Sequence, residues 1–83
     1  MASMHDELRA VIAEIGEIDD PARITDDADL YADLGIDSMQ ALEIVLEMEK
    51  RFDLQVPEDA LRDIRSLADA VRLVERLGSA KKG

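Results

Sequence analysis

Hydrophobic side chains recur at helical spacing near both ends of the chain. Near the amino end the apolar face consists of Leu8, Val11, Ile12 and Ile15. Gly16 suits the position just after such a helix, so the pattern predicts a helix over 4–15. Near the carboxyl end the apolar face consists of Leu67, Ala70, Val71, Val74 and Leu77. With Ser66 as N-cap and Gly78 as the stop, we expect a second helix over 67–77.

The segment 38–52 also has helical spacing, but its apolar residues fall on two opposite stripes. The longer stripe consists of Ala41, Ile44, Val45, Met48 and Phe52. The shorter consists of Met39, Leu42 and Leu46, and it shares its arc with Glu43 and Glu47. Because one helix of a small bundle seldom buries both sides, we expect the longer stripe to face the core and the shorter one to face solvent.

Two segments connect these helices. Residues 17–37 form an unusually long connection, in which recurring apolar residues, Thr25-Asp26-Asp27 turn chemistry and Gly35 predict an ordered loop packed onto the helices. Between Phe52 and Ser66, Pro57 followed by two acids favours a helix of only one to two turns. The pattern predicts an all-α domain over 1–78 with three longer helices and one short one, followed by a disordered tail over 79–83.

The amino-acid composition excludes several kinds of site. The 83 residues include no cysteine and one histidine, His5, so the chain has no thiolate nucleophile and no sulfur ligand for a metal. The first fifteen residues are too polar for a signal peptide, and no apolar run is long enough to span a bilayer. We therefore expect a cytoplasmic monomer with no membrane partner.

Charge is unevenly distributed. The net charge of −10 disfavours nucleic acid and anionic membranes as partners. Residues 1–49 carry fourteen acids and two bases, a net −12, whereas residues 50–83 carry a net +2. Residues 26–49 hold eight acids and no Lys or Arg. This acidic block surrounds one serine, Ser38, and predicts basic protein partners.

Ser38 is the candidate functional residue because it follows Gly35-Ile36-Asp37 directly where a helix is predicted to begin. A phosphodiester at that position would lie near unpaired backbone N–H groups and the positive end of the helix dipole. Taken alone, an ordinary N-cap serine explains the residue better. A hydrolase is disfavoured because no histidine or lysine lies near Ser38 in the sequence, and the acid-rich loop lacks the ligands and glycine of an EF-hand. We expect neither catalytic residues nor a metal site.

The run from Asp33 to Met39, Asp-Leu-Gly-Ile-Asp-Ser-Met, resembles the acyl carrier protein family, as do Glu43-Ile44-Val45, Phe52-Asp53 and Val56-Pro57. The resemblance implies a four-helix bundle and covalent 4′-phosphopantetheine, transferred from coenzyme A onto Ser38 by a phosphopantetheinyl transferase. Acyl groups would be held as thioesters for partners such as acyl-ACP synthases, ketosynthases and acyltransferases.

Several predictions depend on that resemblance. The docking surface is predicted to comprise Asp37, Met39, Leu42, Glu43, Leu46 and Glu47. A folded-back acyl chain is predicted to contact Ile44, Val45, Met48, Ala60, Leu61 and Ile64. Met39, Gln40, Lys50 and Arg51 depart from the common family pattern, which leaves open fatty-acid, polyketide or other lipid assembly. The alternatives are a peptidyl carrier and an unmodified acidic helical interaction module.

Overall fold

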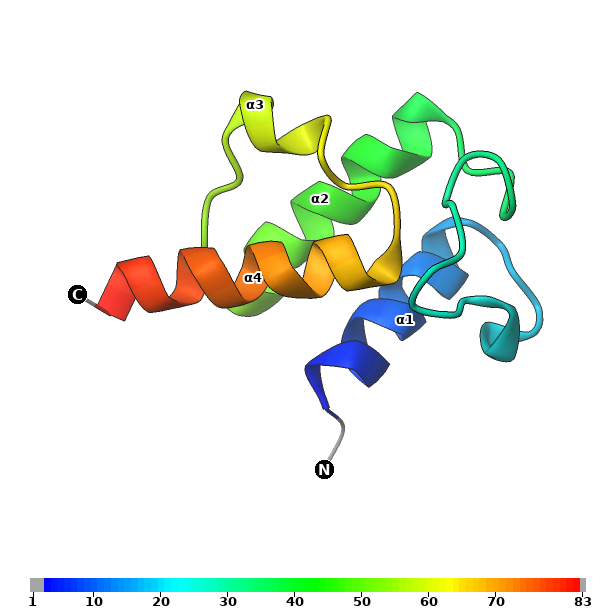
Figure 1. Cartoon of the computed structure of the whole chain (residues 1–83), viewed down its shortest axis with the longest axis horizontal. Helices are drawn as coiled ribbons and strands as arrows, with labels where there is room; N and C mark the ends of the chain where they lie inside the picture. Colours follow the sequence, from blue (N-terminus) through cyan, green and yellow to red (C-terminus); the bar gives the residue numbers. More distant parts are fainter. Residues whose placement is uncertain (1–2, 83) are drawn as a thin grey trace.

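The computed structural model describes residues 3–82, and for 78–82 it describes the backbone alone. The elements are α1 (Met4–Ile15), the short 3-10 helix η1 (Pro21–Arg23), α2 (Ser38–Phe52), α3 (Glu58–Leu61) and α4 (Leu67–Lys82) (Figure 1). Within the described range there is no strand, which confirms the all-α prediction. No helix of residues 3–82 is long and apolar enough to cross a membrane.

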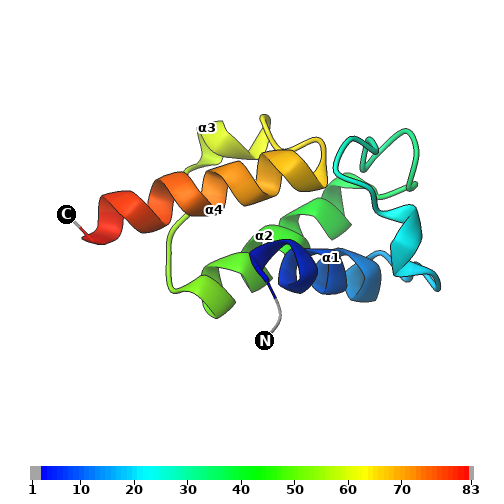
Figure 2. The same cartoon turned by 60° about the horizontal axis from the view of Figure 1, so that its bottom comes forward.

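The three longer helices pack against one another around a single aliphatic core. In both views α3 lies at the edge of the bundle away from α1 (Figures 1 and 2). The most deeply buried side chains are Leu8, Val11, Ile12, Ile24, Leu30, Ile44, Met48 and Leu67. Among the described side chains no buried residue is polar or charged. Stability therefore comes from burying aliphatic surface, worth about 1.5–3 kcal/mol for each fully buried large side chain.

The loop between α1 and α2 is ordered because its apolar residues join this core. Ile18, Ile24, Leu30 and Ile36 are buried, and Leu34 is half-buried. Backbone bonds tie the loop to the start of α4: Leu30 N–H donates to the Arg65 carbonyl at 2.8 Å, and Ala68 N–H donates to the Asp26 carbonyl at 3.2 Å. The sequence predicted the packed loop but not η1, whose single turn is capped by the Asp20 side chain.

Glycines mark both ends of this loop for different reasons. Gly16 caps α1 with an ordinary φ of −80°, but a Cβ there would lie 2.9 Å from the Ile12 carbonyl oxygen and 3.3 Å from Ile36. Gly35 adopts a φ of +71°, the left-handed conformation that a side chain disfavours. The predicted reversal at Gly35 is confirmed, and it delivers the chain to the start of α2.

The start of α4 is as predicted, but its end is not. Ser66 Oγ accepts from Asp69 N–H at 3.2 Å, and Asp69 Oδ2 accepts from Arg65 N–H at 3.1 Å. The expected stop at Gly78 is wrong, because α4 runs on to Lys82. The backbone of 79–82, predicted to be a disordered tail, is therefore helical, and Gly83 lies outside the described residues. A glycine costs only about 1 kcal/mol in a helix, and the following Ala80, Lys81 and Lys82 are good helix formers.

The short helix α3 confirms the prediction of one to two turns after Phe52. It makes a single turn, with Pro57 as its N-cap at an extended ψ of 152° rather than inside the first turn. A proline fits there because a residue at this position need not donate an N–H within the helix.

Candidate functional site

The start of α2 is fixed by a reciprocal pair of hydrogen bonds between Asp37 and Gln40. Asp37 Oδ1 accepts from Gln40 N–H at 2.8 Å, and Gln40 Oε1 accepts from Asp37 N–H at 3.0 Å. Gln40 Nε2 also donates to the Ile15 carbonyl at 3.3 Å, which ties this end of α2 to the end of α1. Asp37 is therefore the N-cap, and the interpretation of Ser38 as an ordinary capping serine is wrong.

Ser38 is the first residue of α2, and its side chain is exposed. Its hydroxyl makes no hydrogen bond to the described part of the chain. The backbone N–H groups of Ser38 and Met39 likewise find no acceptor among residues 3–82, as expected for a first helical turn. A phosphate on Ser38 Oγ would therefore have free N–H donors and the positive end of the dipole beside it. These groups fit a phosphodiester-linked cofactor.

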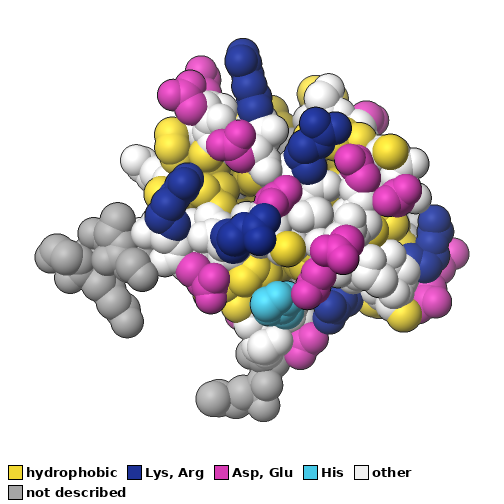
Figure 3. Space-filling model, in the orientation of Figure 1, with side chains coloured by type: hydrophobic (Ala, Val, Ile, Leu, Met, Phe, Trp, Pro, Cys, Tyr) yellow, Lys and Arg dark blue, Asp and Glu magenta, His cyan; other side chains and the backbone are white. Residues whose placement is uncertain are grey.

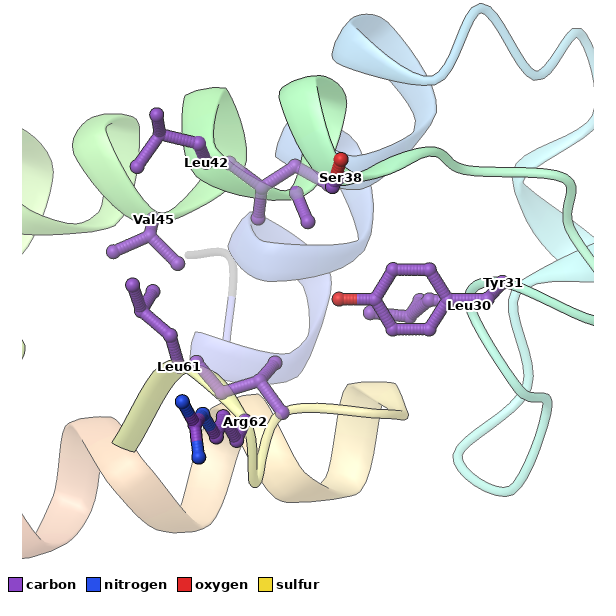
Figure 4. A pocket seen from close by; sticks show the side chains of 10 residues that line it. Leu30, Tyr31, Ser38, Leu42, Val45, Leu61 and Arg62 are labelled. Atoms are coloured by element: carbon purple, nitrogen blue, oxygen red, sulfur yellow. The ribbon is translucent and has the colours of Figure 1, made fainter. Parts of the chain in front are cut away.

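An apolar cleft of about 250 Å³ opens beside Ser38. Its walls come from the α1–α2 loop, the first half of α2, and the α3–α4 segment (Figure 4). The apolar lining includes Leu30, Ala41, Leu42, Val45, Leu61 and Ile64. The polar lining residues are Ser38 itself, Tyr31 and Arg62. The cleft is somewhat smaller than the ~300–1,000 Å³ typical of small-molecule pockets, and it suits a slender apolar chain.

Four of the six residues predicted to contact a folded-back acyl chain line this cleft. Ile44, Val45, Leu61 and Ile64 line the cleft. Met48 and Ala60 do not: Met48 is completely buried in the core, and Ala60 lies beside a different surface depression near Asp63 and Arg72. The helical period explains the position of Met48, because one more turn along α2 carries the side chain past the end of the cleft.

Tyr31 forms the wall contributed by the loop, and the Asp29 carboxylate holds its backbone in place. Asp29 Oδ1 accepts from the N–H groups of Tyr31 at 2.8 Å and Ala32 at 2.9 Å. The Ala32 and Tyr31 N–H bonds, aided by the Arg65 guanidinium at 3.7 Å, hold the pKa of Asp29 below its usual value despite a small opposing effect of burial. Asp29 therefore stays ionised and keeps this loop turn closed at neutral pH.

The outer face of α2 is apolar and exposed, as predicted. The exposed fractions are 67% for Met39, 44% for Leu42 and 54% for Leu46. On the opposite side, Ile44, Val45 and Met48 are buried, and Ala41 and Phe52 are half-buried. One helix thus presents three large apolar side chains to solvent beside Ser38.

The acids along α2 differ in whether their carboxylates are paired with another group. Glu43 is exposed and forms no ion pair or hydrogen bond with the described residues. Glu47 is paired with Arg51, with Oε2 to Nε at 2.9 Å, and Glu49 accepts from Val56 N–H at 2.7 Å. Beyond α2, basic and acidic side chains interleave on the face of α3 and α4 (Figure 3). Negative charge without an ion pair to the described residues therefore lies near the start of α2, at Glu43 and at the capping carboxylate of Asp37.

Sequence reasoning did not assign a role to Tyr31, Gln40 or Arg62. The Gln40 role was readable in principle, because an acid followed three residues later by glutamine matches a capping box. Tyr31 and Arg62 reach the cleft only through the tertiary path of the loop and the α3–α4 turn. His5, disfavoured as a catalytic base, lies 3.9 Å from Asp26.

Comparison with known proteins agrees with this geometry. Residues 6–74 match the family model of the phosphopantetheine attachment site. An acyl carrier protein of Brachyspira hyodysenteriae is 36% identical over 70 residues, covering 84% of this chain and 90% of that protein. One of Phenylobacterium zucineum is 36% identical over 80 residues, covering 95% of this chain and all of that protein.

A solved structure extends the similarity to three dimensions. It is a Mycobacterium tuberculosis protein assigned as an acyl carrier protein, with a TM-score of 0.82 and 27% identity over 89% of this chain and 97% of that one. This likeness confirms the predicted four-helix carrier fold. The chain therefore belongs to the phosphopantetheine attachment site family and is an acyl carrier, not an enzyme, that bears covalent 4′-phosphopantetheine.

Proposed function

We propose that Ser38 is the attachment residue and that the chain carries acyl groups as thioesters to biosynthetic enzymes of fatty-acid, polyketide or related lipid assembly. The observation that carries the proposal is the exposed Ser38 hydroxyl, released from capping by Asp37 and placed at the mouth of an apolar cleft. In an unmodified interaction module a cap would explain the serine, but here that role belongs to Asp37.

The attachment reaction follows from the exposed hydroxyl. Ser38 Oγ forms a new bond to the phosphorus of the pantetheine phosphate, while the pyrophosphate bond of coenzyme A breaks and its adenosine bisphosphate half leaves. The free N–H groups of Ser38 and Met39 stabilise the product phosphodiester. The terminal thiol of the arm then supplies the sulfur for a thioester in a chain that has no cysteine.

The proposed docking surface lies on the outer face of α2, where Met39, Leu42 and Leu46 form an exposed apolar stripe. Exposed contiguous apolar residues rimmed by charge are typical of protein–protein contact sites. Glu43 and the capping carboxylate of Asp37 form no ion pair with the described residues, whereas the Arg51 ion pair reduces the negative charge that Glu47 offers. The partners we propose are a phosphopantetheinyl transferase and acyl-transferring or condensing enzymes with basic residues around an apolar centre.

The decisive experiment is the intact mass of the protein after incubation with coenzyme A, Mg²⁺ and a phosphopantetheinyl transferase. Wild type should gain the mass of one phosphopantetheine, and Ser38→Ala should gain none. The matched control is Ser66→Ala, which removes a capping serine from α4 and should still be modified. Modification of Ser38→Ala at another serine would overturn the assignment.

The docking proposal has its own test in the rate of that reaction. Glu43→Lys should slow modification at low salt, because it reverses a free charge next to Ser38. Rising salt should slow wild-type modification, since the Debye length falls from about 30 Å at 0.01 M to about 8 Å at 0.15 M. Equal rates for wild type and Glu43→Lys at every salt concentration would contradict steering by this face.

A further inference from the structure

The cleft beside Ser38 is apolar except for two hydrogen-bond donors that the carrier role alone does not require. Tyr31 belongs to the loop wall and Arg62 to the α3 wall, so the donors stand on different elements (Figure 4). Ser38, the remaining polar lining residue, has its hydroxyl converted to a phosphodiester in the loaded protein. The polar side chains that remain in the lining are then those of Tyr31 and Arg62.

The position of Tyr31 is set by the surrounding structure. Its backbone N–H is held by Asp29, and the preceding residue, Leu30, is buried and bonded to the Arg65 carbonyl at 2.8 Å. The ring is 38% exposed, and its hydroxyl points into the cleft (Figure 4). No described residue accepts a hydrogen bond from that hydroxyl. The Tyr31 hydroxyl is therefore available to a group that enters the cleft.

Arg62 is unpaired in a chain that carries a net charge of −10. Arg9, Arg51, Arg65 and Arg72 each form an ion pair with an acid. Arg23 and Arg76 form none among the described residues, but they do not line this cleft. Arg62, the C-cap residue of α3, forms none with residues 3–82. Arg62 is exposed, so its five N–H donors bond water and are available to an oxygen of a group that enters the cleft.

We infer that the cleft selects acyl chains that carry an acceptor oxygen near the thioester, the 3-oxoacyl and 3-hydroxyacyl classes, over saturated chains of equal length. This inference rests on the proposed attachment at Ser38. A saturated chain would bury only methylenes and leave both donors to water. An oxo or hydroxyl oxygen would lose its water on entering the cleft, and the Tyr31 and Arg62 donors would replace the lost hydrogen bonds.

The test loads Ser38 with amide-linked pantetheine analogues that carry octanoyl, 3-oxooctanoyl or 3-hydroxyoctanoyl groups. NMR chemical shifts of cleft-lining residues and of the Tyr31 ring then report the equilibrium between an acyl chain inside the cleft and an acyl chain in solvent. The equilibrium constant for the inside state should be about threefold to tenfold greater for the oxygenated chains, the effect expected from one or two hydrogen bonds. Tyr31→Phe and Arg62→Met should each reduce this difference while leaving octanoyl unchanged.

The matched control is Arg76→Met, which removes an exposed arginine of α4 that does not line this cleft. Arg76→Met should show the same difference in equilibrium constant between oxygenated and saturated acyl chains as wild type. Equal constants for the two chain types in wild type, or a difference that survives both Tyr31→Phe and Arg62→Met, would overturn the inference. The intact mass of each sample measures separately whether the analogue is attached. A failure of attachment at Ser38 therefore appears as missing mass, whereas a failure of the inference appears as equal equilibrium constants.

Discussion

The two faces of α2 carry side chains of the same kind in opposite environments. Ile44 is 1% exposed and Met48 is fully buried, whereas Leu46, which lies between them in sequence, is 54% exposed. Hydrophobicity alone does not separate these residues. The direction in which each side chain leaves the helix decides which contacts α1 and α4 and which meets solvent.

The difference assigns separate tasks to the two faces. Burial of a large aliphatic side chain is worth about 1.5–3 kcal/mol, so the inner face holds the bundle together. The outer face does not gain this burial energy, because its three large apolar residues stay at the surface beside Ser38. Contact with partner proteins, the role proposed above, would account for this exposed apolar stripe.

The largest expected effect comes from truncating one residue on each face. Ile44→Ala should lower the free energy of unfolding by about 2–5 kcal/mol, because it leaves a cavity in the core. Leu46→Ala should change it by no more than about 0.5 kcal/mol. Denaturant titration followed by circular dichroism measures both. A loss of several kcal/mol for Leu46→Ala would show that the outer stripe belongs to the core, and the docking proposal would fail.

A second prediction concerns the two neighbouring residues at the start of α2. Asp37→Ala should cost about 0.5–2 kcal/mol of unfolding free energy, because the side chain caps the helix. Ser38→Ala should stay within about 0.5 kcal/mol, since the Ser38 hydroxyl has no protein partner. Ser66→Ala, which removes the cap of α4, should resemble Asp37→Ala. Equal costs at residues 37 and 38 would contradict the division between capping and attachment.

Breaking the ion pair on the outer face of α2 should change the free energy of unfolding less than the substitutions above. Glu47 and Arg51 are four residues apart and partly exposed, a geometry worth about 0.3–0.5 kcal/mol. Glu47→Gln should lower stability by that amount at low salt and by less at high salt. Its effect on the rate of phosphopantetheine transfer should also be smaller than that of Glu43→Gln, because only Glu43 is free. A larger rate effect at Glu47 would reverse the proposed ranking of the two acids.

The smallest effect is a local response to pH in the wall opposite α2. The pKa of Asp29 is lowered in the folded protein, so its stabilising effect is complete above its unfolded pKa of about 3.9 and is lost as pH falls through the folded value. In an acid titration, NMR signals of Tyr31 should shift before the methyl signal of buried Met48. Asp29→Ala should abolish the early Tyr31 shift. Simultaneous movement of both residues would indicate global unfolding instead.

The sequence determined by itself the features that depend on local spacing. The period of apolar residues located the longer helices, with α1 and α2 at their observed bounds. The same period separated the two faces of α2. Each residue advances by about 100° around the helix, so residues two positions apart, such as Ile44 and Leu46, lie on roughly opposite sides. The positive φ at Gly35 and the cap at Ser66 are likewise local properties of the chain.

Tertiary structure decided what depends on segments distant in sequence. The bond from Gln40 to the Ile15 carbonyl, which ties the locally capped start of α2 to α1, is one such feature. By contrast, the extension of α4 beyond Gly78 has a local cause, because good helix formers follow one weak stop signal. Tyr31 and Arg62 are 31 positions apart and line the same cleft only because the loop is bonded to the start of α4. No local pattern encodes such a meeting, since it arises from how separate elements pack.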